Sequence, residues 1–229
     1  MREYQILKSQ SIRYYSNVAE DVNSGLAEPW FFNSGFLGIE AEVDDYNKKH
    51  KKYCLPYVHL IEHYNIDTTD KTILEVACGF GRGCFFLKSK YNATSVTGCD
   101  INPNVISVAQ QLFTKTKFFV ADVVNLQAMQ DKYDIVLTIE TAPYWVNYSS
   151  INESFASVVK QGGSLLIASD IKRTDSIKLP SFRLVGELDI TDNVLLSLNQ
   201  HAESQKQYSK RIKRLETNYR YVSQHYIRE

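Results

Sequence analysis

Residues 72–83 read Thr72-Ile73-Leu74-Glu75-Val76-Ala77-Cys78-Gly79-Phe80-Gly81-Arg82-Gly83. A short apolar run that stops at glycines is typical of a buried strand followed by a tight turn. The next residues, 83–90, have a helical pattern. Glycines let a ligand approach the main chain closely, and the amino end of a helix attracts negative groups. The stretch therefore predicts a site for a nucleoside, a dinucleotide or a carboxylate-bearing ligand.

Strands and helices alternate after this turn. Such alternation predicts an α/β fold with a parallel sheet covered on both faces, and a ligand site at the carboxyl ends of the strands. The expected strands are 95–100, 117–121, 134–139, 164–169, 183–190 and 219–228. The expected helices are 102–114, 152–160 (ended by Gly162-Gly163), and one that runs from Thr191 towards Leu215.

The first third of the chain has a helical pattern and lacks the alternation of strands and helices. Residues 9–22 are expected to form one helix, and residues 41–65 one or two. We therefore divide the chain into a helical cap or lid, 1–70, and a core domain, 71–229.

Charge and composition restrict the partners. Lys plus Arg equals Asp plus Glu, at 26 each, so no net field attracts a polyanion and nucleic acid is disfavoured. The basic stretch 206–214 is interpreted as a solvated helix face, with a nucleic-acid patch as the competing interpretation.

The sequence offers little sign of a targeting segment, a membrane span or a metal site. The first residues have no apolar signal segment behind them, and no window approaches the roughly 20 apolar residues of a membrane span. The four cysteines form no C-x-x-C pair. We expect a cytoplasmic protein with free thiols and no metal.

The spacing of the glycines distinguishes between the candidate classes of ligand. Gly79, Gly81 and Gly83 give G-x-G-x-G, whereas a nicotinamide fingerprint needs G-x-G-x-x-G and here has Cys84 at its third glycine. A phosphate loop needs Gly-Lys-Ser/Thr after its glycines, and Arg82-Gly83-Cys84 does not supply it. A carboxylate at Glu75 would repel a pyrophosphate and attract an ammonium group.

This stretch resembles motif I of the class I S-adenosylmethionine-dependent methyltransferases, with Ala77 where that family usually has glycine. The resemblance implies a Rossmann-like, doubly wound, seven-stranded sheet that is mostly parallel, with an antiparallel last strand inserted between the fifth and sixth. It also implies that Asp100 binds the ribose hydroxyls and that Asp122 meets the adenine amine. The alternative for each aspartate is a purely structural role, as a helix cap or turn former.

Four further stretches resemble the branch that methylates sugars, polyketides and lipids at oxygen. They are residues 30–36 (Trp-Phe-Phe-Asn-Ser-Gly-Phe), 139–145 (Ile-Glu-Thr-Ala-Pro-Tyr-Trp), 168–171 (Ala-Ser-Asp-Ile) and 187–194 (Glu-Leu-Asp-Ile-Thr-Asp-Asn-Val). Where that branch often has a histidine, this chain has Pro143-Tyr144.

The resemblance implies S-adenosylmethionine as cofactor and two sets of site residues. The expected catalytic residues are Glu140, Tyr144 and Asp170. The expected cofactor-binding residues are Tyr15, Phe31, Glu75, Ala77, Cys78, Gly79, Gly81, Gly83, Asp100, Ile101, Asp122, Val123 and Glu140. For Tyr144 and Asp170 the alternatives are ordinary core packing and a loop cap.

We therefore predict methyl transfer to a small molecule, most simply at oxygen, by a monomer or homodimer. An RNA or protein methyltransferase and a non-catalytic S-adenosylmethionine-binding protein stay open as alternatives.

Overall fold

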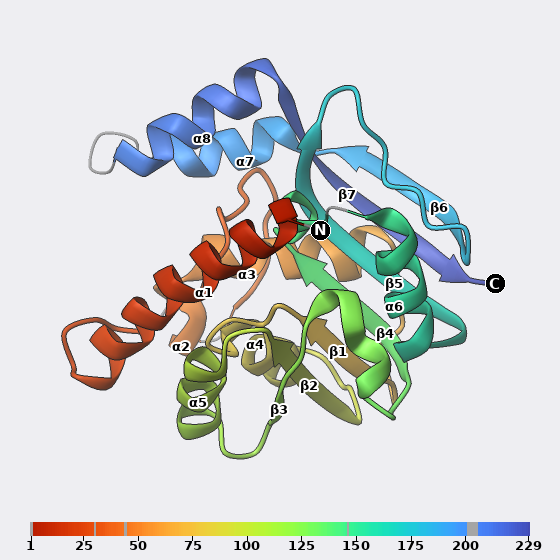
Figure 1. The fold of residues 1–229 in the computed structure, drawn as a ribbon, viewed down its shortest axis with the longest axis horizontal. Coiled ribbons are helices and arrows are strands. Elements are labelled where there is room, and N and C mark those ends of the chain that lie inside the picture. Colours follow the sequence, from red (N-terminus) through yellow and green to blue (C-terminus); the bar gives the residue numbers. More distant parts are fainter. Residues whose placement is uncertain (1, 30, 44, 146, 201–205) are drawn as a thin grey trace.

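The computed structural model describes the chain except for residues 1, 30, 44, 146 and 201–205, and it leaves the side chains of 2–4, 45, 46 and 206–208 undescribed. Trp30 and the side chain of Lys206, both part of the sequence interpretation, therefore lie outside the described residues. Elsewhere the chain forms one sheet with helices on both faces (Figure 1).

Seven strands form this sheet, in the order β3-β2-β1-β4-β5-β7-β6. Their bounds are β1 Thr72–Val76, β2 Ser95–Asp100, β3 Lys117–Val120, β4 Tyr133–Ile139, β5 Val159–Lys172, β6 Phe182–Asp189 and β7 Tyr219–Arg228. Strands β1 to β5 pair in parallel, and β7 pairs antiparallel with both β5 and β6. The predicted doubly wound sheet, with an antiparallel last strand between the fifth and sixth, is confirmed.

Helices of several kinds surround the sheet. The α-helices are α1 Arg2–Asn23, α2 Asp45–Lys48, α3 Lys51–Val58, α4 Arg82–Lys90, α5 Pro103–Leu112, α6 Tyr148–Val158, α7 Thr191–Asn199 and α8 Lys206–Thr217. Three short segments complete the set: the π-helix η1 His59–His63 and the 3₁₀ helices η2 Val123–Ala128 and η3 Ala142–Tyr144.

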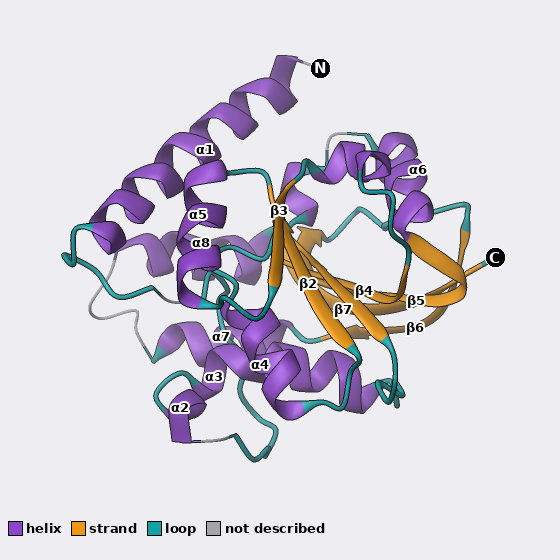
Figure 2. Cartoon of the chain, turned by 90° about the horizontal axis from the view of Figure 1, so that it is seen from below, coloured by secondary structure: helices purple, strands orange, loops and turns teal. Residues whose placement is uncertain are grey.

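Side-chain alternation along the strands builds two cores. On β1, Ile73 packs into the cluster that includes α3, α4 and α7, whereas Leu74 packs into the cluster that includes α6. The helices accordingly lie on both sides of the sheet (Figure 2). Because successive residues of a strand point to opposite faces, a strand buried on both sides has apolar residues at adjacent positions, as Ile73 and Leu74 show here.

Local signals explain the start of α5. The Asn102 side chain accepts hydrogen bonds from the backbone N–H groups of Asn104 and Val105, and Pro103 occupies the first helical position, as predicted. Helix α1 packs against α5 through a small cluster that joins Ala19 to Val105 and Val108. This contact brings α1 beside the ends of β2 and β3.

Two predictions of the element bounds were wrong. Helix α6 ends at Val158 rather than at the glycines, because β5 begins at Val159 and runs through them. Its pairing with β4 shifts register there, and Gly162 has φ 72°. The single helix expected from Thr191 towards Leu215 is two helices, α7 and α8. Residues 41–65, where one or two helices were expected, hold α2 and then α3, which continues directly into the π-helix η1. The boundary between residues 70 and 71 stays a prediction.

All four cysteines are buried free thiols. Within the described ranges, no helix has the length and apolar character needed to cross a bilayer. The described residues also contain no cluster of three or more His, Cys, Asp or Glu side chains placed to hold a metal ion.

A buried and an exposed phenylalanine allow a test of the assigned core. Phe155 is fully buried between α6 and the sheet, whereas Phe119 on the edge strand β3 is 42% exposed. Phe155→Ala should lower the free energy of unfolding by about 3–5 kcal/mol, and Phe119→Ala by less than about 1 kcal/mol. Urea unfolding measures both, and equal losses would contradict the assigned core.

Candidate functional site

A cavity lies at the carboxyl ends of β1 to β4, and we call it the main cavity. Parallel register aligns the strand ends, because Val76 pairs with Cys99 and Thr138, and Asp100 pairs with Val120. The lining residues are Lys8, Ser11, Tyr15, Phe32, Val76, Ala77, Gly79, Asp100, Ile101, Val105, Ala121, Asp122, Val123, Ile139, Glu140, Thr141 and Tyr144.

The glycine-rich turn forms one wall. Ala77, Gly79 and Gly81 have φ of 61°, 54° and 74°, all in the left-handed region. Glycine adopts this region readily, whereas alanine adopts it at a cost of roughly 1–2 kcal/mol. A Cβ on Gly79 would lie 2.6 Å from the Phe32 ring, so only glycine lets that ring cover the turn.

The other two glycines of the turn have packing roles. Gly81 caps the start of α4 and lies against Phe118, lining no cavity that we describe. Gly83 leaves room for the Tyr57 hydroxyl and the Glu75 carboxylate. Their place in the predicted motif thus reflects the turn and its packing.

Asp100 is held at the end of β2 by backbone donors. Its Oδ2 accepts from Gly79 N at 3.1 Å and its Oδ1 accepts from Asn102 N at 2.9 Å. Burial raises the pKa of this carboxyl group, and the backbone hydrogen bonds oppose that shift. Each carboxylate oxygen retains a second lone pair directed at further donors.

Asp122 performs two structural tasks. Its Oδ1 caps η2 by accepting from Val124 N at 3.1 Å, and its Oδ2 pairs with Lys8 Nζ of α1 at 2.7 Å. The helix-cap interpretation therefore holds for one oxygen. The Lys8 pair ties α1 to the end of β3.

Glu75 lies in a second, smaller cavity, lined also by Phe31, Cys78 and Gly83. The Tyr57 hydroxyl donates to its Oε1 at 2.7 Å and the Cys84 thiol donates to its Oε2 at 3.0 Å. Burial raises the pKa of Glu75 to about 7, although these hydrogen bonds lower it. The carboxyl group thus changes charge near neutral pH.

Glu140 follows β4 with φ 63°, a strained backbone for a non-glycine residue. Its Oε1 accepts from Ser34 N at 2.7 Å and from the Tyr221 hydroxyl at 3.2 Å. Asn33 positions that amide, because its Oδ1 accepts from Gly35 N and turns the chain around Ser34. The Asn-Ser-Gly segment thus points a backbone donor at the carboxylate.

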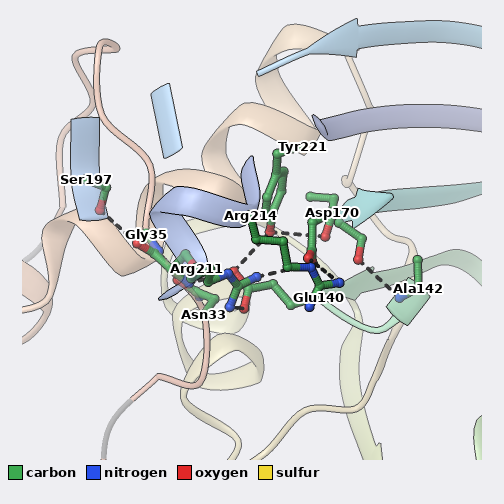
Figure 3. A network of polar contacts seen from close by, with 12 residues as sticks. Asn33, Gly35, Glu140, Ala142, Asp170, Ser197, Arg211, Arg214 and Tyr221 are labelled. Atoms are coloured by element: carbon green, nitrogen blue, oxygen red, sulfur yellow. Dashed lines mark hydrogen bonds and ion pairs between the residues drawn. The ribbon is translucent and has the colours of Figure 1, made fainter. Parts of the chain in front are cut away.

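Asp170 and Glu140 share one arginine of α8. Arg211 Nη1 lies 2.7 Å from Glu140 Oε2, and its Nη2 lies 3.3 Å from Asp170 Oδ1 (Figure 3). Arg214 Nη2 lies 3.2 Å from Asp170 Oδ2. The interpretation of 206–214 as a solvated face was wrong for these two arginines, since α8 packs over the strand ends and points them inwards.

A third hollow, the α8 pocket, adjoins the main cavity. It is lined by Tyr15, Phe32, Glu140, Pro143, Tyr144, Asp170, Lys210, Arg211 and Arg214. Four of these side chains, Tyr15, Phe32, Glu140 and Tyr144, line the main cavity as well. The three expected catalytic residues therefore meet here.

Most sequence-predicted residues converge on these three hollows, and Gly81 does not. The sequence interpretation missed Lys8, Phe32, Arg211 and Arg214. The Phe31-Phe32 pair contains a usable signal, since adjacent residues of an extended segment point apart. Phe31 enters the core and Phe32 covers the turn, but the pattern alone does not say which does which.

Known proteins resemble this chain in sequence and in fold. A family profile described as "Methyltransferase domain" matches residues 73–163, which include β1 to β4 and the glycine-rich turn. A geranyl diphosphate C-methyltransferase from Streptomyces coelicolor shares the fold, with a TM-score of 0.74 over 99% of this chain and 98% of that one at 14% identity.

Residues 73–163 are thus similar to a methyltransferase domain, and the chain has the fold of this solved methyltransferase. Two curated relatives agree. A phthiotriol/phenolphthiotriol dimycocerosates methyltransferase of Mycobacterium leprae is 28% identical over 59% of this chain and 48% of its own length. A fatty-acid O-methyltransferase of Mycolicibacterium smegmatis is 26% identical over 75% of this chain and 61% of its own length. The chain spans about half the length of several curated relatives that it matches.

The buried carboxyl group of Glu75 predicts a pH effect on stability. Because its folded pKa is raised from 4.5 to about 7, its contribution is fully present below pH 4.5 and is lost as pH rises through 7. The loss is roughly 3 kcal/mol, at 1.36 kcal/mol for each pKa unit. Relative to wild type, Glu75→Gln should gain about that much stability between pH 4.5 and pH 8, as measured by urea unfolding. Parallel pH curves would contradict the assignment.

The ion pairs of Arg211 predict a second effect on stability, this time from charge. Arg211→Ala leaves two carboxylates with less compensation, and should cost about 3 kcal/mol in urea unfolding. Adding Glu140→Gln and Asp170→Asn should recover part of that loss. Lys213→Ala on the exposed side of α8 is the control, with an expected change below about 0.5 kcal/mol. No recovery in the triple variant would show that Arg211 acts through packing alone.

Proposed function

We propose that this chain is an S-adenosylmethionine-dependent methyltransferase that acts on a small-molecule acceptor, most simply at oxygen. One observation carries the proposal: carboxylates at the ends of successive strands, Asp100, Asp122 and Glu140, line a single cavity beside a glycine-rich turn. Such a convergence at the carboxyl edge of a parallel sheet is typical of a nucleotide-like ligand site.

The residues present fit that cofactor. Asp100 offers oxygen lone pairs to ribose hydroxyls, and Ile101 and Val123 supply apolar walls beside it for the adenine. Glu75 lies in the adjoining cavity, where its charged form would attract the ammonium group of the methionine part. Ala77 and Gly79 line both cavities, and neither has a long side chain that would separate them. When bound, S-adenosylmethionine supplies an activated methyl group.

The chain's own contribution to transfer would be alignment, which is worth up to about 7–11 kcal/mol. Tyr15, Phe32 and Tyr144 line both the main cavity and the α8 pocket, so they would bring donor and acceptor together. Glu140 and Asp170 are already fixed by arginines, and would act as positioned charges. The fatty-acid O-methyltransferase among the relatives favours oxygen as the atom methylated.

We also propose the domain division of 1–70 and 71–229, a cytoplasmic location, and a monomer or homodimer as the working form. The neutral charge, at 26 basic and 26 acidic side chains, favours a small molecule over nucleic acid as acceptor.

Calorimetric titration with S-adenosylhomocysteine tests the cofactor site. Asp100→Ala should weaken binding at least tenfold, or about 1.4 kcal/mol, because hydrogen bonds to a charged group are lost. Asp131→Ala, an exposed residue before β4, is the control and should leave the affinity unchanged. Asp100→Asn keeps the shape of the turn and separates lost charge from lost folding. An unchanged affinity in both Asp100 variants would overturn the ribose assignment.

A further inference from the structure

The α8 pocket has a surplus of positive charge. Its walls carry three cations, Lys210, Arg211 and Arg214, and two carboxylates, Glu140 and Asp170. Both carboxylates are matched: Arg211 pairs with each of them, and Arg214 pairs with Asp170. Among the described residues no ion pair involves Lys210, so one positive charge lacks a partner there.

The remaining polar groups of the pocket do not offset this charge. Burial raises the pKa of Tyr15, as do Tyr144 and Glu140, and burial likewise raises the pKa of Tyr144. Both phenols are therefore neutral at physiological pH. The net charge of the pocket lining is accordingly positive.

The arginines also retain unused donors. The Nε atoms of Arg211 and Arg214 are buried and have no hydrogen-bond partner among the described residues. The Arg214 guanidinium lies 3.8 Å from the centre of the Tyr219 ring, which holds it in place at the pocket wall.

The opposite side of the pocket is aromatic. Tyr15 and Phe32 lie 4.7 Å apart between ring centroids, and Phe32 is equally close to Phe80. This aromatic wall is shared with the main cavity, where the methyl donor is proposed to lie. One end of the pocket thus suits an anion, and the other suits an uncharged body next to the donor.

We propose that the methyl acceptor carries an anionic group, a carboxylate or a phosphate, which binds Lys210 and Arg214 while its apolar part lies against Tyr15, Phe32 and Tyr144. This proposal rests on the proposed function, since it assigns the acceptor side of the same site. Guanidinium and ammonium groups bind both kinds of anion through charge-assisted hydrogen bonds.

The test compares three probes with one alkyl chain: octanoate, octyl phosphate and octan-1-ol. Calorimetric titration of each, with and without S-adenosylhomocysteine, should give at least tenfold tighter binding for one or both anions than for the alcohol. The tighter of the two anions identifies the head group. Raising the salt concentration should weaken the anions and leave the alcohol unchanged.

Matched variants of α8 locate the site. Lys210→Gln should weaken anion binding about fivefold or more, while Lys213→Gln should leave it unchanged. Both variants remove one lysine charge from the same helix, and both lysines are exposed, but Lys213 lines none of the three hollows. Circular dichroism checks that both variants fold.

Several outcomes would overturn the proposal: equal affinity for alcohol and anions, equal weakening in both variants, or no anion binding up to about 10 mM. Absence of S-adenosylhomocysteine binding is a separate result. It would overturn the proposed function, whereas the anion titrations without that ligand would still report on the α8 pocket.

Discussion

Parallel pairing of β1 with β2 and β4 is the constraint on which the site depends. The register places Val76 beside Cys99 and Thr138, so the residues after each strand emerge at one edge. Asp100 and Glu140 are 40 positions apart in the chain and yet line the same cavity for this reason. A slip of one residue would turn every side chain of a strand to the opposite face and separate them.

The sequence was sufficient for the sheet and for the strand-end acids, because both depend on local patterns. Apolar runs mark buried strands, and parallel pairing brings the residues at their carboxyl ends to one edge of the sheet. It was insufficient for Arg211, because a basic helix has the same pattern whether it faces water or a buried carboxylate. That partner was Asp170, which lies on a strand 41 residues earlier. The same limit explains why the sequence did not reveal the role of Phe32. It also explains why β5 runs through Gly162, where pairing with β4 outweighed the local glycine signal.

The ionic cluster around Arg211 connects elements that no backbone pairing joins. It binds α8 to the ends of β4 and β5, and through Ser34 it also reaches the segment before α2 (Figure 3). Buried ion pairs contribute little net stability because desolvation offsets attraction, but they specify one arrangement. The α8 pocket is therefore defined by charge, and the glycine-rich side of the main cavity by backbone shape.

The position of β7 has a consequence for the order of assembly. β6 pairs only with β7 among the described strands, so residues 182–189 cannot join the sheet until 219–228 are available. Tyr221 lies in that strand, and Arg211 and Arg214 lie in α8 just before it. During synthesis the half of the sheet that lines the main cavity can form first, since β1 to β4 pair among themselves, and nascent chains fold from the amino end. The α8 pocket becomes complete only when the last strand is inserted.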